Sequence, residues 1–457
     1  MKKVKTCISK MTEKQYWPFW FLAIIQLVYH CVMREDPGSD AMWFFRNQLD
    51  TYTLKDYLTI RYHVWTSRIL IEAVLVYVAK SMVLWKILDW FMWMLFAVSL
   101  SVIFGKTEDK YRSNWILVGL ILIYPLSELG GAGWIATTTN YIWPLALGTF
   151  VFSGTAKVFR GEKIQWWLYL LYIPALLYAA NAEQMCAVML GLEALTILYL
   201  VVTKKQGNRW VILLPFLFIC IAEFLFIMTC PGNAARKHDE IADYMQNYGT
   251  YNLIDKVDLG FVDTLKHLVS SGNLLFLILT VVLAVFVFLR TKESAARLVS
   301  IIPVAWTIVL TFFPNVFETQ FPQFAGILDK NELINGYNYV WGYSYLPFIL
   351  YAFITLCILL CIVWIAKSWE EFFVYFCLLA IGLASRVIMG FSPTIFVSGE
   401  RTFLCLYMMI VVAIAAVIEN NREELVKHPK LAQAMELGGA CILLVSLFGG
   451  FMAASAI

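Results

Sequence analysis

Three acidic side chains stand together directly after the first long apolar segment of the chain. Glu35, Asp36 and Asp40 lie within REDPGSD, where Pro37 and Gly38 favour a tight turn. Such a turn can bring Asp36 and Asp40 toward one point. Carboxylates so placed could act as a general base toward a hydroxyl group or hold a divalent cation through oxygen ligands. We therefore take Asp40 and Asp36 as candidate catalytic residues, beside the alternative that each is a solvated segment end.

Arginine side chains occur in several of the other polar segments. PGNAAR ends with Arg236 and SGER ends with Arg401, and both follow apolar stretches. Because a guanidinium group matches phosphate with two parallel hydrogen bonds, we take these two arginines and Arg68 as candidate phosphate ligands. The alternatives are contact with lipid headgroups and, for Arg401, simple pairing with Glu400.

Hydrogen-bonding side chains occur at the ends of the same apolar segments. The connection at 181–183 is too short to leave the bilayer surface, so Asn181 and Glu183 must lie at its depth. Ionisable groups at that depth usually face the bundle interior or a wet cavity. The candidate substrate contacts are Asn140, Asn181, Glu183, Asn233, His63, His238 and Glu400.

The elements that must position these residues are membrane-spanning helices. The chain is 61% hydrophobic and only 15% charged over 457 residues. A helix needs roughly 20 apolar residues to cross the hydrocarbon core, and continuous rather than alternating apolar runs exclude a barrel. We expect an all-α polytopic bundle of about 13 spans, at 17–33, 66–104, 115–127, 140–156, 165–181, 184–203, 210–230, 273–289, 298–313, 342–366, 372–389, 402–418 and 433–455.

The distribution of lysine and arginine predicts which loops share a side. They are about four times as dense in one alternate set of loops as in the other. The dense set is 1–16, 105–114, 157–164, 204–209, 290–297, 367–371 and 419–430, and the sparse set is 34–65, 127–139, 181–183, 231–272, 314–341 and 390–401. The N-terminus is therefore expected in the cytoplasm, provided that 66–104 crosses once, and the chemically interesting loops face out.

The predicted organisation is a single transmembrane domain over 1–457. Its first outer loop, 34–65, carries the acids and two short stretches with the spacing of amphipathic helices lying in the interface. Longer outer loops are expected at 231–272 and 314–341. The lipid bilayer is the surrounding partner, and no nucleic-acid partner is expected.

Several short motifs together resemble a known superfamily. SDAMWF, RYHVWTSRIL, TNYIWP, NAEQ and PGNAAR are similar to a bacterial family related to the serotype-converting glucosyltransferases of cell-surface polysaccharides, within the GT-C superfamily of membrane glycosyltransferases. The resemblance implies transfer of a sugar from a polyprenyl-phosphate donor to a glycan or lipid-linked acceptor at the outer face of the cytoplasmic membrane.

The resemblance also implies roles for residues. The first outer loop of such enzymes supplies an acid that acts as base or binds metal, and the matching positions here are Asp36 and Asp40. Relatives commonly have adjacent acids before an aromatic residue, whereas this chain has Ser39 before Asp40. Asp40 is therefore the first choice for the base, no cofactor is expected, and a divalent cation stays open. Arg236 and Arg401 would steady the leaving phosphate.

Two other functions fit the same composition. A transporter or flippase of lipid-linked sugar would place polar residues at mid-membrane on broken helices, whereas only Glu72, Glu193 and Glu223 lie deep in the predicted spans. A polysaccharide polymerase or ligase would use similar lipid-linked substrates. No Walker loop, HExxH, GxSxG or zinc-binding spacing occurs in the chain.

Overall fold

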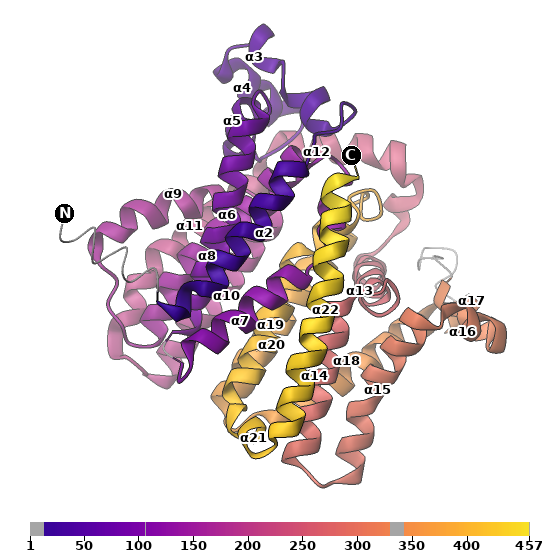
Figure 1. The fold of residues 1–457 in the computed structure, drawn as a ribbon. Coiled ribbons are helices and arrows are strands. Elements are labelled where there is room, and N and C mark those ends of the chain that lie inside the picture. The colour runs from indigo at the N-terminus through magenta and orange to yellow at the C-terminus, as the bar shows by residue number, and fades with distance from the viewer. Residues whose placement is uncertain (1–12, 106, 330–341, 457) are drawn as a thin grey trace. The chain divides into compact units, whose positions relative to one another are not determined.

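The computed structural model describes residues 13–105, 107–329 and 342–456. Every regular element in these ranges is a helix (Figure 1). Nine of the described helices are long and apolar enough to cross a membrane, and a bent pair would make a tenth. The chain is therefore a multi-pass, all-helical membrane protein, as its composition predicted.

Each predicted apolar segment overlaps a helix, but several of these helices are short. The helices α2 (Trp17–Val32), α7 (Lys110–Ile123) and α9 (Tyr169–Ala180) have 16, 14 and 12 residues. At 1.5 Å per residue they are shorter than the roughly 30 Å of a bilayer's hydrocarbon core. The count of about 13 crossings therefore stays a prediction.

The chain forms two compact units, and neither is one continuous segment. Unit 1 is Met1–His238, Gly399–Cys405 and Gly439–Ile457, and unit 2 is Asp239–Ser398 and Leu406–Gly438. The chain passes between the two units four times. Neither unit could therefore be cut out as one continuous stretch of sequence.

Unit 1 is built around α8 (Trp134–Phe159), which is largely buried. The helices that pack against α8 include α6 (Met82–Phe104), α9 and α10 (Glu183–Thr203), and α11 (Leu214–Thr229) packs on α9 and α10. The final part of α22 (Pro429–Ser455) also belongs to this unit, where the Tyr29 hydroxyl donates to the Leu447 carbonyl at 3.0 Å.

The first polar loop contains three short helices, where its sequence predicted two. They are η2 (Ala41–Phe45), α3 (Gln48–Thr51) and α4 (Leu54–Val64). The Thr53 hydroxyl caps α4 by accepting from the Asp56 amide at 3.2 Å. Arg61 then joins α4 to the next helix through two hydrogen bonds to Glu72, at 2.7 and 2.6 Å.

The segment 66–104 contains one helix that is long and apolar enough to cross a membrane. It divides into α5 (Ile69–Val78) and α6, and α5, with ten residues, is only about half as long as a span needs. The Ser67 carbonyl, just before α5, accepts from Asn181 at 3.1 Å, and Lys80, just after it, pairs with Asp50 at 2.8 Å. Both ends of α5 therefore meet predicted outer loops, which leaves the crossing to α6.

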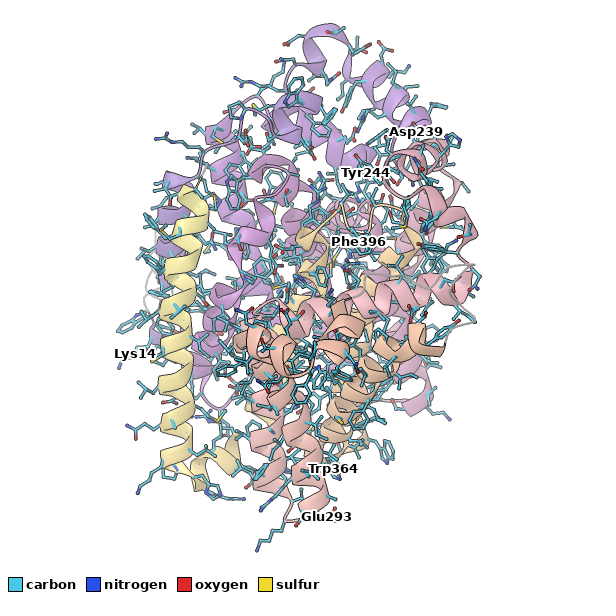
Figure 2. All side chains as sticks on the ribbon, turned by 90° about the vertical axis from the view of Figure 1, so that its right-hand side faces the viewer. Lys14, Asp239, Tyr244, Glu293, Trp364 and Phe396 are labelled. Carbon is cyan, nitrogen blue, oxygen red and sulfur yellow. The ribbon has the colours of Figure 1, made fainter. Side chains whose placement is uncertain are left out.

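Unit 2 contains a further set of apolar helices. They are α13 (Leu253–Ser270), α14 (Leu274–Arg290), α15 (Ser294–Phe312), α18 (Leu346–Ile365), α19 (Trp369–Val387) and most of α20 (Leu404–Asn420). The pair α13 and α14 is bent by 82°. Figure 2 places Tyr244 and Phe396 toward one end of this unit and Glu293 and Trp364 toward the other.

The two long predicted outer loops are mostly helical where they are described. Residues 231–272 form α12 (Pro231–Tyr244), η6 (Gln246–Thr250) and α13, which begins with a capping box between Asn252 and Asp255. The other loop, 314–341, contains α16 (Pro314–Gln320) and α17 (Pro322–Asp329). The helix η7 (Gly342–Tyr345) follows directly after it. Residues 330–341 of that predicted loop lie outside the described residues.

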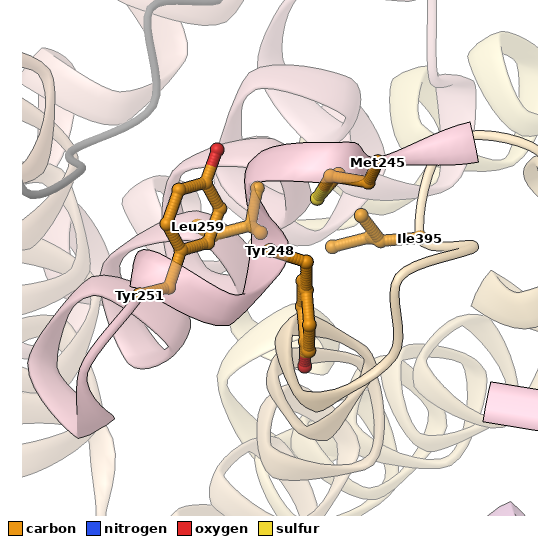
Figure 3. Close-up of a cluster of buried hydrophobic side chains, with 5 residues drawn as sticks. All are labelled: Met245, Tyr248, Tyr251, Leu259 and Ile395. Atoms are coloured by element: carbon orange, nitrogen blue, oxygen red, sulfur yellow. The ribbon is translucent and has the colours of Figure 1, made fainter. Parts of the chain in front are cut away.

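A small cluster of buried apolar side chains holds three segments of unit 2 together. Met245, Tyr248, Tyr251, Leu259 and Ile395 are all buried and pack together (Figure 3). They come from η6 and the residues on either side of it, from α13 and from the segment after η8 (Ile388–Phe391). The Tyr248 hydroxyl also donates to the Gly390 carbonyl at 3.2 Å, so the cluster ties these three elements together.

In unit 1, loops of each predicted set contact loops of the same set. Hydrogen bonds and ion pairs join outer loops to outer loops and cytoplasmic loops to cytoplasmic loops, as expected if the two sets lie at opposite ends of the helices. The contacts within the predicted outer set include Glu35 with Ile135 and Asp40 with Ala132, and those within the predicted cytoplasmic set include Asn114 with Gln15 and Arg209 with Gly161.

Candidate functional site

The motif PGNAAR is held against the start of α5 by its second and third residues. A Cβ atom on Gly232 would lie 2.6 Å from the Trp65 amide nitrogen and from the Tyr62 carbonyl oxygen, so the backbones approach too closely for any other residue. Asn233 accepts from the Ser67 amide at 3.1 Å and donates to the Ser67 hydroxyl at 3.0 Å. These contacts fix the first turn of α12, and Arg236 follows one turn later.

Two arginines converge on one carboxylate at the start of α10. Arg68 donates to Glu183 at 2.6 Å, and Arg236 lies 3.9 Å from the other oxygen of the same carboxylate. Arg68 also donates to the Asn140 side chain at 3.2 Å, and its guanidinium lies over the ring of Tyr141. We call Arg68, Glu183, Arg236 and Asn140 the arginine cluster.

The arginine cluster is partly open to solvent. The side chains of Arg68 and Arg236 are each 24% exposed and that of Glu183 is 27% exposed. Burial lowers the pKa of Arg68, but the charges and hydrogen bonds of Glu183 and Tyr141 together outweigh burial and raise the pKa, so Arg68 stays charged. Two guanidinium groups facing one carboxylate form a setting for an anion.

Asn181 holds the backbone next to Arg68 through hydrogen bonds. Its side-chain oxygen accepts from the Leu70 and Ile71 amides at 2.9 and 3.3 Å, and its nitrogen donates to the Ser67 carbonyl at 3.1 Å. The residue is 2% exposed. Asn181 and Asn233, both predicted substrate contacts, hold the backbone around Ser67, next to Arg68.

The acidic turn forms as predicted, but its two candidate carboxylates have different surroundings. The Ser39 amide donates to the Asp36 carbonyl at 3.0 Å, which closes the turn. Asp36 is exposed, and its carboxylate accepts from the Gly38 amide at 2.7 Å, so it stabilises its own turn. The Asp40 amide instead donates to the Ala132 carbonyl at 3.2 Å, which attaches this residue to the 127–139 loop.

Asp40 faces an arginine from the far end of the sequence. Arg401 lies 3.9 Å from the Asp40 carboxylate, and the two side chains are 24% and 45% exposed. Burial raises the pKa of Asp40, and the charge of Arg401 opposes that rise. A carboxylate whose pKa is raised while it stays reachable from solvent is suited to accept a proton.

Glu35, the first acid of the turn, was not among the candidate site residues. Its carboxylate accepts from the Ile135 amide at 3.1 Å, at the positively polarised start of α8. Gly133 adopts a positive φ of 87° there, and a Cβ atom on it would overlap Glu35 and Ser39. Burial nevertheless raises the pKa of Glu35 despite these hydrogen bonds. Its geometry attaches the acidic turn to α8.

A third group of polar residues surrounds the segment 399–405. Glu400 and Arg401 lie in η9 (Glu400–Phe403), which packs on η3 (Leu126–Leu129). Tyr124 lies close to Glu128 and Glu400. Sequence patterns could not predict that Tyr124 and Glu128 lie near Glu400, because more than 270 residues separate them from it.

Neighbouring residues of α10 connect these groups. Glu183 belongs to the arginine cluster, and Gln184 donates to the Thr402 carbonyl at 2.8 Å. Thr402 follows Arg401, which faces Asp40. The start of α10 therefore links the candidate phosphate ligands to the candidate base.

The two candidate histidines have less specific surroundings. His63 is exposed, and its Nδ1 lies 2.8 Å from the Thr59 carbonyl within α4. His238 is exposed on α12, two residues after Arg236. Among the described residues, no group of three or more His, Cys, Asp and Glu side chains could hold a metal ion.

Comparison of the chain with protein-family models, with curated proteins and with solved structures finds no match in any of the three.

Proposed function

We propose that this protein is a glycosyltransferase of the GT-C type that moves a sugar from a polyprenyl-phosphate donor to a cell-surface glycan at the outer face of the cytoplasmic membrane. The observation that carries this proposal is the arginine cluster at the ends of apolar helices, linked through α10 to the half-exposed acid Asp40.

The place of the arginine cluster suits a lipid-borne phosphate. Arg68 precedes α5, Arg236 follows α11, and Glu183 begins α10, so all three stand where an apolar helix starts or ends. The phosphate of a membrane lipid lies at the same level, at the boundary between hydrocarbon and water. A donor that diffuses in the bilayer would present its phosphate to these guanidinium groups without leaving the membrane.

The reaction needs one base and one set of cations. The acceptor hydroxyl oxygen attacks the anomeric carbon of the donor sugar, and the bond from that carbon to the phosphate oxygen breaks. Asp40 accepts the hydroxyl proton, while the bond electrons leave with the phosphate. Arg68 and Arg236 stabilise the charge that develops on the leaving phosphate. Attack opposite the leaving group inverts the configuration of the anomeric carbon.

Transfer in reconstituted liposomes tests this proposal. The assay uses a panel of radiolabelled polyprenyl-phosphate sugars as donors. We expect Asp40→Asn to lower the transfer rate at least a hundredfold, because an amide cannot act as the base. Asp36→Asn is the matched control, since Asp36 only stabilises its own turn, and should retain most of the rate. Each assay is run with and without EDTA to test for a divalent cation. Full activity of folded Asp40→Asn protein would contradict the role of Asp40.

A flippase of lipid-linked sugar is the second candidate, because ionisable side chains also lie buried inside the helices. His30 of α2 contacts Asp89 of α6 at 3.0 Å, and Glu193 of α10 accepts from the Thr155 hydroxyl of α8 at 2.6 Å. Buried ionisable groups in membrane helices often mark transport pathways. Movement of labelled lipid between leaflets, without transfer from any donor, would favour this function.

A further inference from the structure

An apolar cavity of about 170 Å³ lies inside unit 2, beside the bend between α13 and α14. These two helices line it with Leu265, Leu268, Phe276 and Leu279, and α18, α19 and α20 supply the rest of the lining. The axes of α13 and α14 diverge by 82° at the bend. Their side chains therefore leave a space that the three neighbouring helices do not fill.

Hydrogen bonds hold this bend in place. The Asn273 side chain accepts from the Phe276 amide at 2.9 Å and so caps the start of α14. The same side chain donates to the Tyr407 hydroxyl of α20. The cavity thus follows from a bend that is fixed by polar contacts on both sides of the break.

The lining of the cavity selects a hydrocarbon. Of the described residues that line it, only Thr355 has a polar side chain, and its hydroxyl donates to the Tyr351 carbonyl of its own helix at 2.9 Å. Apolar cavities of this kind stay dry, and one of roughly 150 Å³ lined by Leu, Ile and Phe binds benzene. The cavity in unit 2 therefore suits a short piece of hydrocarbon and neither water nor a polar headgroup.

The cavity lies at the depth where lipid chains end. Thr355 and Ile358 are near the middle of α18, and Phe376 and Ala380 are near the middle of α19. The middle of an apolar span of about 20 residues lies near the centre of the bilayer. Phe376 lines the cavity and is also 39% exposed, so the cavity reaches the lipid-facing surface beside this ring.

We propose that this cavity binds the methyl end of an acyl chain from a membrane glycerolipid. A lipid chain is as apolar as leucine, so its entry gains nothing from the hydrophobic effect. An empty cavity, however, forfeits the dispersion contacts of its lining side chains. A flexible chain end that enters from the bilayer restores those contacts.

The missing polar anchor decides which hydrocarbon occupies the site. Binding sites that select one ligand use a few precisely placed polar groups to fix its orientation, and the described lining offers none beyond Thr355. Such a cavity takes the hydrocarbon that is most concentrated around it, and in a bilayer this is the acyl chain. The inference does not depend on the proposed function.

Photolabelling of the full-length protein in nanodiscs tests the proposal. One phosphatidylcholine probe carries a diazirine at the methyl end of an acyl chain, and the other carries it beside the chain's carbonyl. Crosslinked residues are mapped by mass spectrometry. We expect the methyl-end probe to label the cavity lining at least about fivefold more than the carbonyl-end probe, because the lining lies near the bilayer centre. Equal labelling by both probes, or no labelling of the lining, would overturn the proposal.

A matched pair of variants distinguishes the cavity from the surface around it. Ala380→Phe fills the cavity, so labelling of Leu265 and Leu279 should fall by about fivefold, because no room for a chain remains. Ala384 is exposed one turn further along α19 and is not among the described residues of the lining. Ala384→Phe should therefore keep the labelling of the wild type.

The unfolding midpoint in detergent shows whether each variant is folded, and Ala380→Leu is the smaller replacement if the phenylalanine lowers that midpoint. Unchanged labelling of Leu265 and Leu279 in a folded Ala380 variant would show that the probe reaches them without the cavity, which contradicts the proposal.

Competition identifies the kind of chain. Unlabelled phosphatidylcholine and a polyprenyl phosphate are each added at the same small mole fraction. We expect both to lower labelling by the methyl-end probe only in proportion to that fraction. A far larger loss with the polyprenyl phosphate would show that the cavity prefers an isoprenoid chain, and would overturn the assignment to an acyl chain.

Discussion

The two aspartates of the acidic turn show how far a side chain's role depends on its neighbours. Asp36 and Asp40 are four residues apart, yet Asp36 accepts from its own turn while Asp40 faces Arg401. Because Arg401 opposes the effect of burial on Asp40, this pair should control the pH at which Asp40 can act as a base.

At this scale we predict a pH effect. The pKa of Asp40 is raised above its usual value, and a base works only when it is deprotonated, so activity should fall as the pH drops through that raised pKa. Removing the opposing cation in Arg401→Gln should raise the pKa of Asp40 further and move the acidic limb of kcat/KM to higher pH. The profile is measured between pH 4 and 9.

The position of the limb, and not its height, is the quantity to compare, since Arg401 is also a candidate phosphate ligand. An acidic limb that stays in place or moves to lower pH in Arg401→Gln would contradict the coupling. Asp36→Asn provides a control in which no change of the limb is expected.

The short elements between the spans determine where the arginines stand. The first turn of α12 lies against the start of α5 because Gly232 allows the backbones to meet and Asn233 binds Ser67. Asn181 holds the same backbone from α9. The PGN part of PGNAAR therefore holds the backbone in place, and Arg236 lies one turn further along α12, beside Glu183.

We predict that Gly232→Ala destabilises the protein by about 1–3 kcal/mol, because the added methyl group would meet three backbone atoms that cannot move independently. The measurement is the thermal unfolding midpoint in detergent. Gly119→Ala is the control: that glycine lies in α7 with nothing within 4 Å of an added Cβ, and alanine should stabilise the helix slightly. Equal midpoints for the two variants would show that the close approach is not needed.

The loops of the chain are predicted to alternate between the two sides of the membrane. Lysine and arginine are concentrated in one set of loops, and in unit 1 each set makes contacts within itself. The division of 66–104 into a short α5 and a crossing α6 preserves this alternation. The positive charges predict that the set containing Asp40 faces out.

Labelling of introduced cysteines tests the orientation. Lys55→Cys in the first outer loop should react with an impermeant maleimide on intact cells, whereas Lys163→Cys should react only after permeabilisation. Both lysines are exposed. The background carries Cys31→Ser and Cys441→Ser, because these thiols are exposed, and Cys7→Ser, whose position lies outside the described residues. Labelling in the reverse order would invert the predicted topology.

The sequence by itself determined the class of the protein, the place of its helices and the grouping of its loops. Apolar runs at 140–156 and 184–203 predicted α8 and α10 closely, because the hydrophobicity that drives a helix into a bilayer is a property of consecutive residues. The acidic turn at Asp36 and the short helices after Asp40 were also predictable, since turn and helix preferences act over a few residues.

Only the tertiary structure decided which polar residues meet. It placed Glu183 between Arg68 and Arg236, brought Arg401 to Asp40, and gave Asn181 and Asn233 to the backbone. These partners are separated by tens to hundreds of residues. The apolar spans between them predict helices, but they do not predict which polar side chains at the helix ends will meet. Their pairing follows from how the helices pack, because packing depends on side-chain shapes from all the neighbouring helices together.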